Sequence, residues 1–138
     1  MKDLGNVNLP SSLTIDSLER NTIGETNEVF FCIGAFEGRP VSAYVKVSKH
    51  PNLSLSNERA VLQILAETDV PVPAVLWYGE AERDVLITEA LPGRMIWDWI
   101  DPRRGTYDKP QALKYLVAYG EWLARIHGLA IPWPGQVR

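Results

Sequence analysis

The segment VSAYVKVSKHPNLSLSNERAVLQIL, residues 41–65, decides the fold. Its first seven residues alternate between apolar and polar types, which predicts a β-strand with one apolar face. That face consists of Val41, Ala43, Val45 and Val47. Tyr44 and Lys46 fall on the opposite face, so the strand presents an aromatic ring and an ammonium group away from its apolar side.

The second half of the segment predicts an amphipathic helix. Its apolar stripe is formed by Leu55, Leu62 and Leu65, and Glu58 falls within this stripe. A lysine and a glutamate that are both directed inward would pair, because either charge alone is costly to bury. Such a pair can hold an ammonium group in place for an anionic ligand, which is what a nucleotide-phosphate site requires.

Each of these polar residues also has a purely structural interpretation. Lys46 could be an exposed strand lysine that shields a sheet edge. Glu58 could be an acid near a helix N-terminus that interacts with the helix dipole. Tyr44 could be a cross-strand aromatic packing partner. These alternatives stay open at the level of the residues alone.

Composition and length exclude several classes of protein. The 138 residues suffice for one domain with a hydrophobic core, and the net charge of −3 argues against a nucleic-acid partner. A single cysteine, Cys32, excludes an intrachain disulfide and fits a reducing compartment. We find no apolar window long enough to span a membrane and no apolar signal segment in residues 1–13. The chain is therefore expected to be cytoplasmic, without a membrane partner.

Outward from this segment, the sequence predicts strands first and helices last. Residues 1–12 form a polar N-terminal arm. Strands are expected at 13–20, 29–36, 41–48, 75–79 and 84–88, with one helix starting near Ser54 or Ser56 and running to about residue 68. Pro71 and Pro73 force extended backbone after that helix. The predicted class is α+β, with a five-stranded antiparallel sheet and one helix.

The last third of the chain is predicted to be helical. Residues 90–93 form a linker, because Pro92-Gly93 cannot continue a strand. One or two helical turns are expected at 95–100, and a helix with a wide apolar stripe at about 111–128. This stripe has no evident partner, so we expect residues 94–138 to begin a truncated helical region and the fragment to self-associate.

The order of these features resembles the N-terminal lobe of the aminoglycoside phosphotransferase family, which comprises kinase-like small-molecule phosphotransferases. The resemblance runs from about residue 13 to 129. It rests on Gly24-Glu25-Thr26-Asn27, Tyr44-Val45-Lys46, Asn57-Glu58, Val70-Pro71-Val72-Pro73-Ala74-Val75, Leu86-Ile87-Thr88-Glu89, Leu91-Pro92-Gly93 and Leu123-Ala124-Arg125-Ile126-His127. It implies a protein-kinase-like N-lobe at 13–89, a hinge at 90–93 and the start of a helical C-lobe at 94–138.

The resemblance implies that ATP is the cofactor. Lys46 would bind the α- and β-phosphates, and Glu58 would hold Lys46 by an ion pair. The loop that contains Gly24 and Thr26 would cover the phosphates. The remaining implied nucleotide contacts are Ile23 and Tyr44 on the two faces of the adenine, Thr88 at the gate of the pocket, and the Glu89 carbonyl and Leu91 N–H at the adenine edge.

The sequence also departs from the family pattern. His127-Gly128-Leu129 matches the first two residues of the family's catalytic His-Gly-Asp segment, but Leu129 cannot act as a base. The catalytic aspartate, its asparagine and the metal-binding aspartate are not found, so no catalytic or metal-binding residue is assigned. Bound magnesium and the small-molecule acceptor are expected only with the missing part of the C-lobe. The chain as given should not catalyse phosphoryl transfer.

Three functions are compatible with these features. The first is the ATP-binding portion of an O-phosphotransferase that transfers the γ-phosphate to a substrate hydroxyl when the catalytic lobe is present. The second is a module that binds nucleotide without transfer, and the third is a degenerate kinase-like lobe used for protein interaction. The acceptor is not specified, although Gly38-Arg39-Pro40-Val41 and residues 60–65 slightly favour the aminoglycoside branch and hence antibiotic resistance.

Overall fold

The computed structural model of the protein describes residues 4, 7–21, 27–51 and 54–129. The chain divides into two compact units, Met1–Leu91 and Pro92–Arg138. Among the described residues, the first unit holds the strands and one helix, and the second holds two helices.

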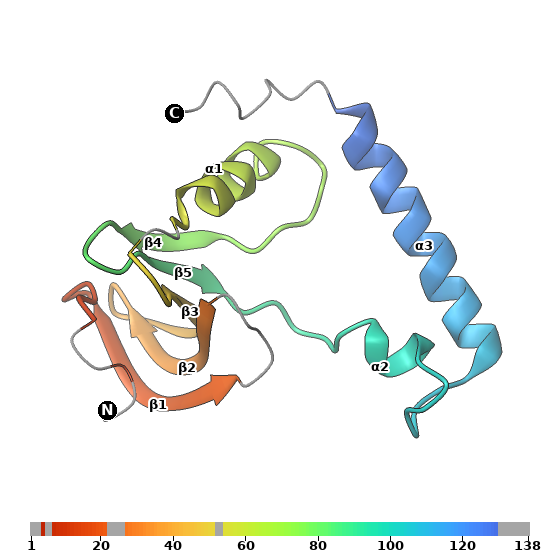
Figure 1. Ribbon diagram of the computed structural model, residues 1–138, viewed down its shortest axis with the longest axis horizontal. Helices are drawn as coiled ribbons and strands as arrows, with labels where there is room; N and C mark the ends of the chain where they lie inside the picture. Colours follow the sequence, from red (N-terminus) through yellow and green to blue (C-terminus); the bar gives the residue numbers. More distant parts are fainter. Residues whose placement is uncertain (1–3, 5–6, 22–26, 52–53, 130–138) are drawn as a thin grey trace. The chain divides into compact units, whose positions relative to one another are not determined.

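The first unit is a five-stranded antiparallel sheet with one helix (Figure 1). The elements in chain order are β1 Leu13–Asn21, β2 Asn27–Phe36, β3 Arg39–Ser48, α1 Ser56–Leu65, β4 Val75–Gly79 and β5 Val85–Glu89. In the sheet the order is β1-β2-β3-β5-β4, which places β3 in the middle. The prediction of an α+β fold with this sheet and helix is confirmed.

The hairpin between β2 and β3 closes more tightly than predicted. Glu37 and Gly38 have φ angles of 51° and 77°, and Phe36 pairs directly with Arg39. Two consecutive positive φ angles are the mark of the two-residue turn whose twist matches that of the flanking strands. β3 therefore begins at Arg39 rather than at residue 41. Pro40 is tolerated there because β5 pairs with β3 only from Ala43 onward.

The core of this unit lies on the face of β3 that the alternating pattern predicted. Ala43, Val45 and Val47 are fully buried. They pack with buried residues of the neighbouring strands and the N-terminal arm, namely Leu4, Phe30, Cys32, Val85 and Ile87. Burial raises the pKa of the Cys32 thiol, so this cysteine is an uncharged core residue.

α1 is shorter than predicted at its C-terminal end. It ends at Leu65, three residues before the expected end at 68. The Thr68 hydroxyl donates to the Leu65 carbonyl at 2.7 Å and accepts from the Val70 N–H at 3.1 Å. A threonine that bonds the backbone on both sides competes with the helical pattern, so the helix closes there.

The second unit contains two helices, α2 Trp97–Ile100 and α3 Lys109–Gly128. α3 begins two residues earlier than predicted, because the Asp108 carboxylate accepts from the Gln111 N–H at 3.0 Å and Pro110 fits the first turn. The predicted apolar stripe includes residues that this unit leaves exposed, among them Leu113, Leu116 and Val117. Within the described ranges, neither α3 nor a shorter helix combines the length and the hydropathy that crossing a bilayer requires.

Candidate functional site

Lys46 lies at the centre of a row of side chains that crosses the sheet. Val29 of β2 and Leu86 of β5 are its direct cross-strand neighbours, and Asn21 of β1 is paired with Val29. Residues directly opposite in antiparallel strands project to the same face. This face is the one opposite the core face of β3, so the row forms the floor of a site outside the hydrophobic core.

Glu58 of α1 reaches Lys46 from above this floor. Glu58 Oε1 lies 2.5 Å from Lys46 Nζ, with 40% and 28% of the two side chains exposed. Because β3 is central, the interpretation of Lys46 as an edge-shielding lysine is wrong. Ion pairs with this much exposure contribute about 0–1 kcal/mol to stability, so the fold does not depend on the pair. Its charges remain accessible to a ligand.

The pair lines a cavity of about 320 Å³ in the first unit. Two further predicted site residues, Tyr44 and Thr88, line the same cavity. The Tyr44 ring lies 5.5 Å from the Phe31 ring across the β2–β3 ladder, so Tyr44 also makes the cross-strand aromatic contact of its structural interpretation. The structure thus brings together Tyr44, Lys46, Glu58 and Thr88.

The structure does not add the other predicted residues to this cavity. The Glu89 N–H donates to the Ala74 carbonyl at 2.9 Å, and the Ala90 N–H donates to the Ser42 carbonyl at 2.8 Å. Leu91 is half exposed. Glu89 and Leu91 are not among the residues that line the cavity, while Ile23, Gly24 and Thr26 lie outside the described residues.

The cavity is also lined by apolar and amide side chains that were not predicted from the sequence to belong to the site. They are Asn21, Val29, Leu62, Pro73 and Leu86. A signal for Val29 was present: a two-residue turn at Glu37-Gly38 pairs Phe36 with Arg39, and counting back along the hairpin pairs Val29 with Lys46. Leu86 had no such signal, because β5 joins β3 across a long connection that fixes no register.

The chemistry of this cavity fits a nucleotide better than a metal ion. Apolar walls suit a planar base, and an ammonium group oriented by a carboxylate suits phosphate oxygens. In the part of the chain that the structure describes, no group of three or more His, Cys, Asp or Glu residues could hold a metal ion.

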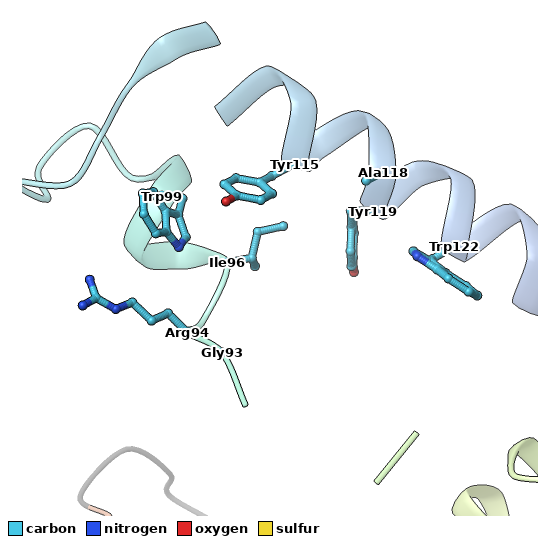
Figure 2. A pocket seen from close by; sticks show the side chains of 8 residues that line it. All are labelled: Gly93, Arg94, Ile96, Trp99, Tyr115, Ala118, Tyr119 and Trp122. Atoms are coloured by element: carbon cyan, nitrogen blue, oxygen red, sulfur yellow. The ribbon is translucent and has the colours of Figure 1, made fainter. Parts of the chain in front are cut away.

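A second cavity lies in the second unit, between α2 and α3 (Figure 2). Its volume is about 590 Å³, and it is lined by Gly93, Arg94, Ile96, Trp99, Tyr115, Ala118, Tyr119 and Trp122. The Trp99 and Tyr115 rings lie 5.7 Å apart and pack α2 on α3. This cavity is larger and more aromatic than the Lys46 cavity, but it contains no opposed charge pair among its lining residues.

The five-stranded antiparallel sheet with one helix is the fold of a kinase-like N-lobe, and a strand lysine is paired with a helix glutamate on it. The chain belongs to the phosphotransferase enzyme family (APH), whose family model matches residues 17–138. The resemblance drawn from the sequence is thereby confirmed. Comparisons with curated proteins and with solved structures give no match.

Proposed function

We propose that the Lys46 cavity binds ATP. The chain is then the ATP-binding portion of an O-phosphotransferase that acts on a small-molecule hydroxyl when the catalytic lobe is present. The observation that carries this proposal is the Lys46–Glu58 pair, which lies in a cavity, adds little to stability and leaves the ammonium accessible. Family membership supports the transferase class over a non-catalytic binding or interaction module.

Each residue of the cavity has a role in this proposal. The Lys46 ammonium binds the α- and β-phosphates, and Glu58 holds that ammonium in place. Val29 and Leu86 provide apolar surface beside the ion pair. Tyr44 and Thr88 contact the base. ATP, when bound, supplies the phosphoryl group.

The proposal assigns nucleotide binding, and no transfer step, to this chain. A catalytic aspartate, a magnesium site and the acceptor-binding residues are expected in a further part of the C-lobe. The single cysteine is buried and fits a reducing compartment, so we place the protein in the cytoplasm as part of this proposal.

Calorimetric titration of the 138-residue chain with ATP tests the proposal. Lys46→Met should weaken ATP binding by roughly 10- to 100-fold, because it removes a charge-assisted contact to phosphate. Lys114→Met makes the same chemical change at an exposed position of α3 and should leave the affinity unchanged. ATP binding that is equal in the wild type and in Lys46→Met would contradict the proposal.

A further inference from the structure

The first turn of α1 is attached to the sheet through Asp84, the residue immediately before β5. The Leu55 N–H, at the start of α1, donates to Asp84 Oδ2 at 2.9 Å. The Tyr78 hydroxyl of β4 donates to the same oxygen at 2.9 Å. A carboxylate beside a helix N-terminus is also favoured by the helix dipole. One carboxylate oxygen therefore joins the helix to two strands.

The backbone of Asp84 is itself fixed against β3. Its N–H donates to Ser48 Oγ at 2.9 Å, and its carbonyl accepts from the Ser48 N–H at 2.9 Å. Ser48 is fully buried. Because its N–H and its carbonyl both bond to Ser48, Asp84 is fixed beside the end of β3, and its carboxylate presents an acceptor to α1 at a defined place.

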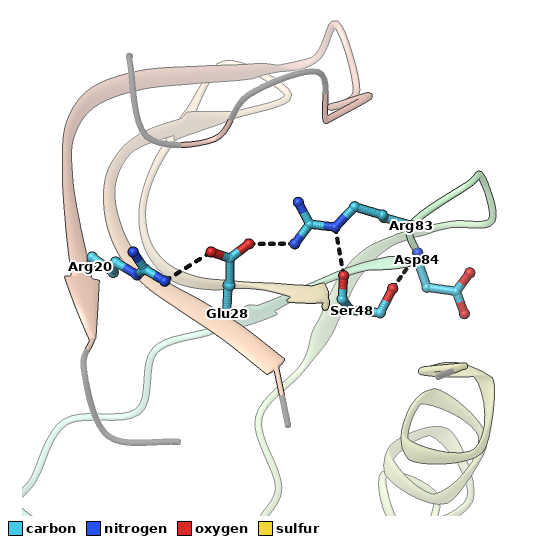
Figure 3. Close-up of polar contacts among 5 residues, drawn as sticks. All are labelled: Arg20, Glu28, Ser48, Arg83 and Asp84. Carbon is cyan, nitrogen blue, oxygen red and sulfur yellow. Dashed lines mark hydrogen bonds and ion pairs between the residues drawn. The ribbon is translucent and has the colours of Figure 1, made fainter. Parts of the chain in front are cut away.

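The same region extends across the sheet through a chain of charged residues (Figure 3). Arg83 donates to the Ser48 carbonyl at 2.7 Å and forms an ion pair with Glu28 of β2. Glu28 also pairs with Arg20 of β1 at 2.9 Å. These contacts link the ends of β1, β2 and β3 to the residues that precede β5.

A second contact attaches the same turn of the helix. The Arg59 guanidinium lies 4.6 Å from the centroid of the Tyr78 ring. Burial, together with the hydrogen bond to Asp84, raises the pKa of Tyr78, so the hydroxyl stays protonated and remains a donor. Leu55 and Arg59 therefore hold α1 on either side of Glu58, the residue that pairs with Lys46.

We propose that Asp84 is a positioning residue for the nucleotide site: its carboxylate holds the first turn of α1 against the sheet and thereby sets Glu58 opposite Lys46. Glu58 follows Leu55 by three residues, less than one helical turn, so displacement of Leu55 moves Glu58 with it. The functional part of this inference rests on the proposed ATP binding, whereas its geometric part does not.

Two variants of Asp84 test the inference. Asp84→Ala removes the acceptor, and Asp84→Asn retains an oxygen acceptor in a side chain of nearly the same shape. In nucleotide-free protein, the nuclear Overhauser effect between the Lys46 ε-protons and the Glu58 γ-protons should vanish in Asp84→Ala and persist in Asp84→Asn. Asp84→Ala should also weaken ATP binding by roughly fivefold while adenosine binding changes little.

The inference is overturned if folded Asp84→Ala retains the nuclear Overhauser effect between Lys46 and Glu58. It is also overturned if Asp84→Ala weakens adenosine binding as much as ATP binding. If Asp84→Ala fails to fold, Asp84→Ser replaces it. The serine hydroxyl is one bond closer to the backbone than the carboxylate oxygen, so it also withdraws the acceptor from the Leu55 N–H. If the wild type does not bind ATP, the proposed function fails while the proton measurement still decides whether Asp84 positions Glu58.

Discussion

The Lys46 cavity and the aromatic cavity of the second unit differ in a way that separates size from chemistry. The aromatic cavity of the second unit measures about 590 Å³, and the Lys46 cavity of the first unit about 320 Å³. The larger one is walled by rings that pack α2 on α3. The smaller one contains an oriented ammonium group on a central strand. Of these two cavities, the smaller one therefore has the chemistry that suits an anionic ligand, so volume is a poor guide to such a site.

The difference follows from how each cavity is built. In the first unit the core face of β3 is filled by buried side chains, so the opposite face is free to carry Lys46 without cost to the core. In the second unit the aromatic side chains both line the cavity and join the helices. Changes at the aromatic cavity should therefore affect stability, and changes at the Lys46 cavity should affect the proposed nucleotide binding.

The largest effect on stability is expected from Trp99→Ala in α2. Loss of the Trp99–Tyr115 contact should destabilise the second unit by roughly 1–3 kcal/mol. Hydrogen exchange of α3 amides should accelerate while that of β3 amides stays unchanged. Trp97→Ala is the matched control, because Trp97 is 60% exposed and should change exchange much less. A tenfold loss of ATP affinity in Trp99→Ala would instead make the aromatic cavity the nucleotide site.

A smaller effect is expected from Glu58→Gln in the first unit. The amide keeps an oxygen near Lys46 but removes the charge that orients the ammonium, so ATP affinity should fall by roughly three- to tenfold. Stability should change by less than about 1 kcal/mol, because the pair is partly exposed. Calorimetry with ATP and with adenosine measures the difference. Glu67→Gln, just beyond α1, is the control, and an equal effect of both variants would argue against a specific role for Glu58.

The smallest effect concerns the pH dependence of the first unit. The hydrogen bond from Arg83, with the charges of Arg83 and Arg20, holds the pKa of Glu28 below its ordinary value of 4.5. Ionised Glu28 therefore stabilises the fold above that value, and this stability is lost as the pH falls through the lowered pKa. At pH 7, Glu28→Gln should be less stable than the wild type by up to about 1 kcal/mol, after allowance for solvent screening.

Urea unfolding of both proteins between pH 7 and pH 3 measures this difference. The gap should begin to close near pH 4.5 and should shrink further as the pH falls. Glu37→Gln, at the exposed hairpin turn, serves as control and should change stability by less than about 0.5 kcal/mol at any pH. A gap for Glu28→Gln that is constant across the range would mean that its pKa is not lowered by folding.

The sequence predicted most of the sheet and the central ion pair, because both depend on local periodicity. The alternation in β3 placed Lys46 opposite the core, and the spacing in α1 placed Glu58 toward the strand. The alternation could not show that β3 is central, which depends on strand pairing far along the chain. The central position of β3 excludes the interpretation of Lys46 as a lysine that shields a sheet edge.

Contacts between distant segments could not be predicted. Leu86 reaches Lys46 only through the register of β5 on β3, and Asp84 reaches Leu55 across 29 positions of sequence. Neither pairing leaves a periodic signal in the chain. The early end of α1 depends on the Thr68 hydroxyl, which bonds the Leu65 carbonyl in competition with the helical hydrogen bonds. The spacing of apolar residues does not predict this bond.

The proposed nucleotide binding at Lys46 can be tested by mapping amide chemical shifts during titration with an ATP analogue that cannot be hydrolysed. We expect the largest shifts at Val29, Lys46, Glu58 and Thr88, and no response at Trp99 and Tyr115. The same titration with adenosine should spare Lys46 and Glu58, because no phosphate reaches them. Shifts concentrated around Trp99 and Tyr115, or no saturable shift at Lys46, would show that the Lys46 cavity is not the nucleotide site.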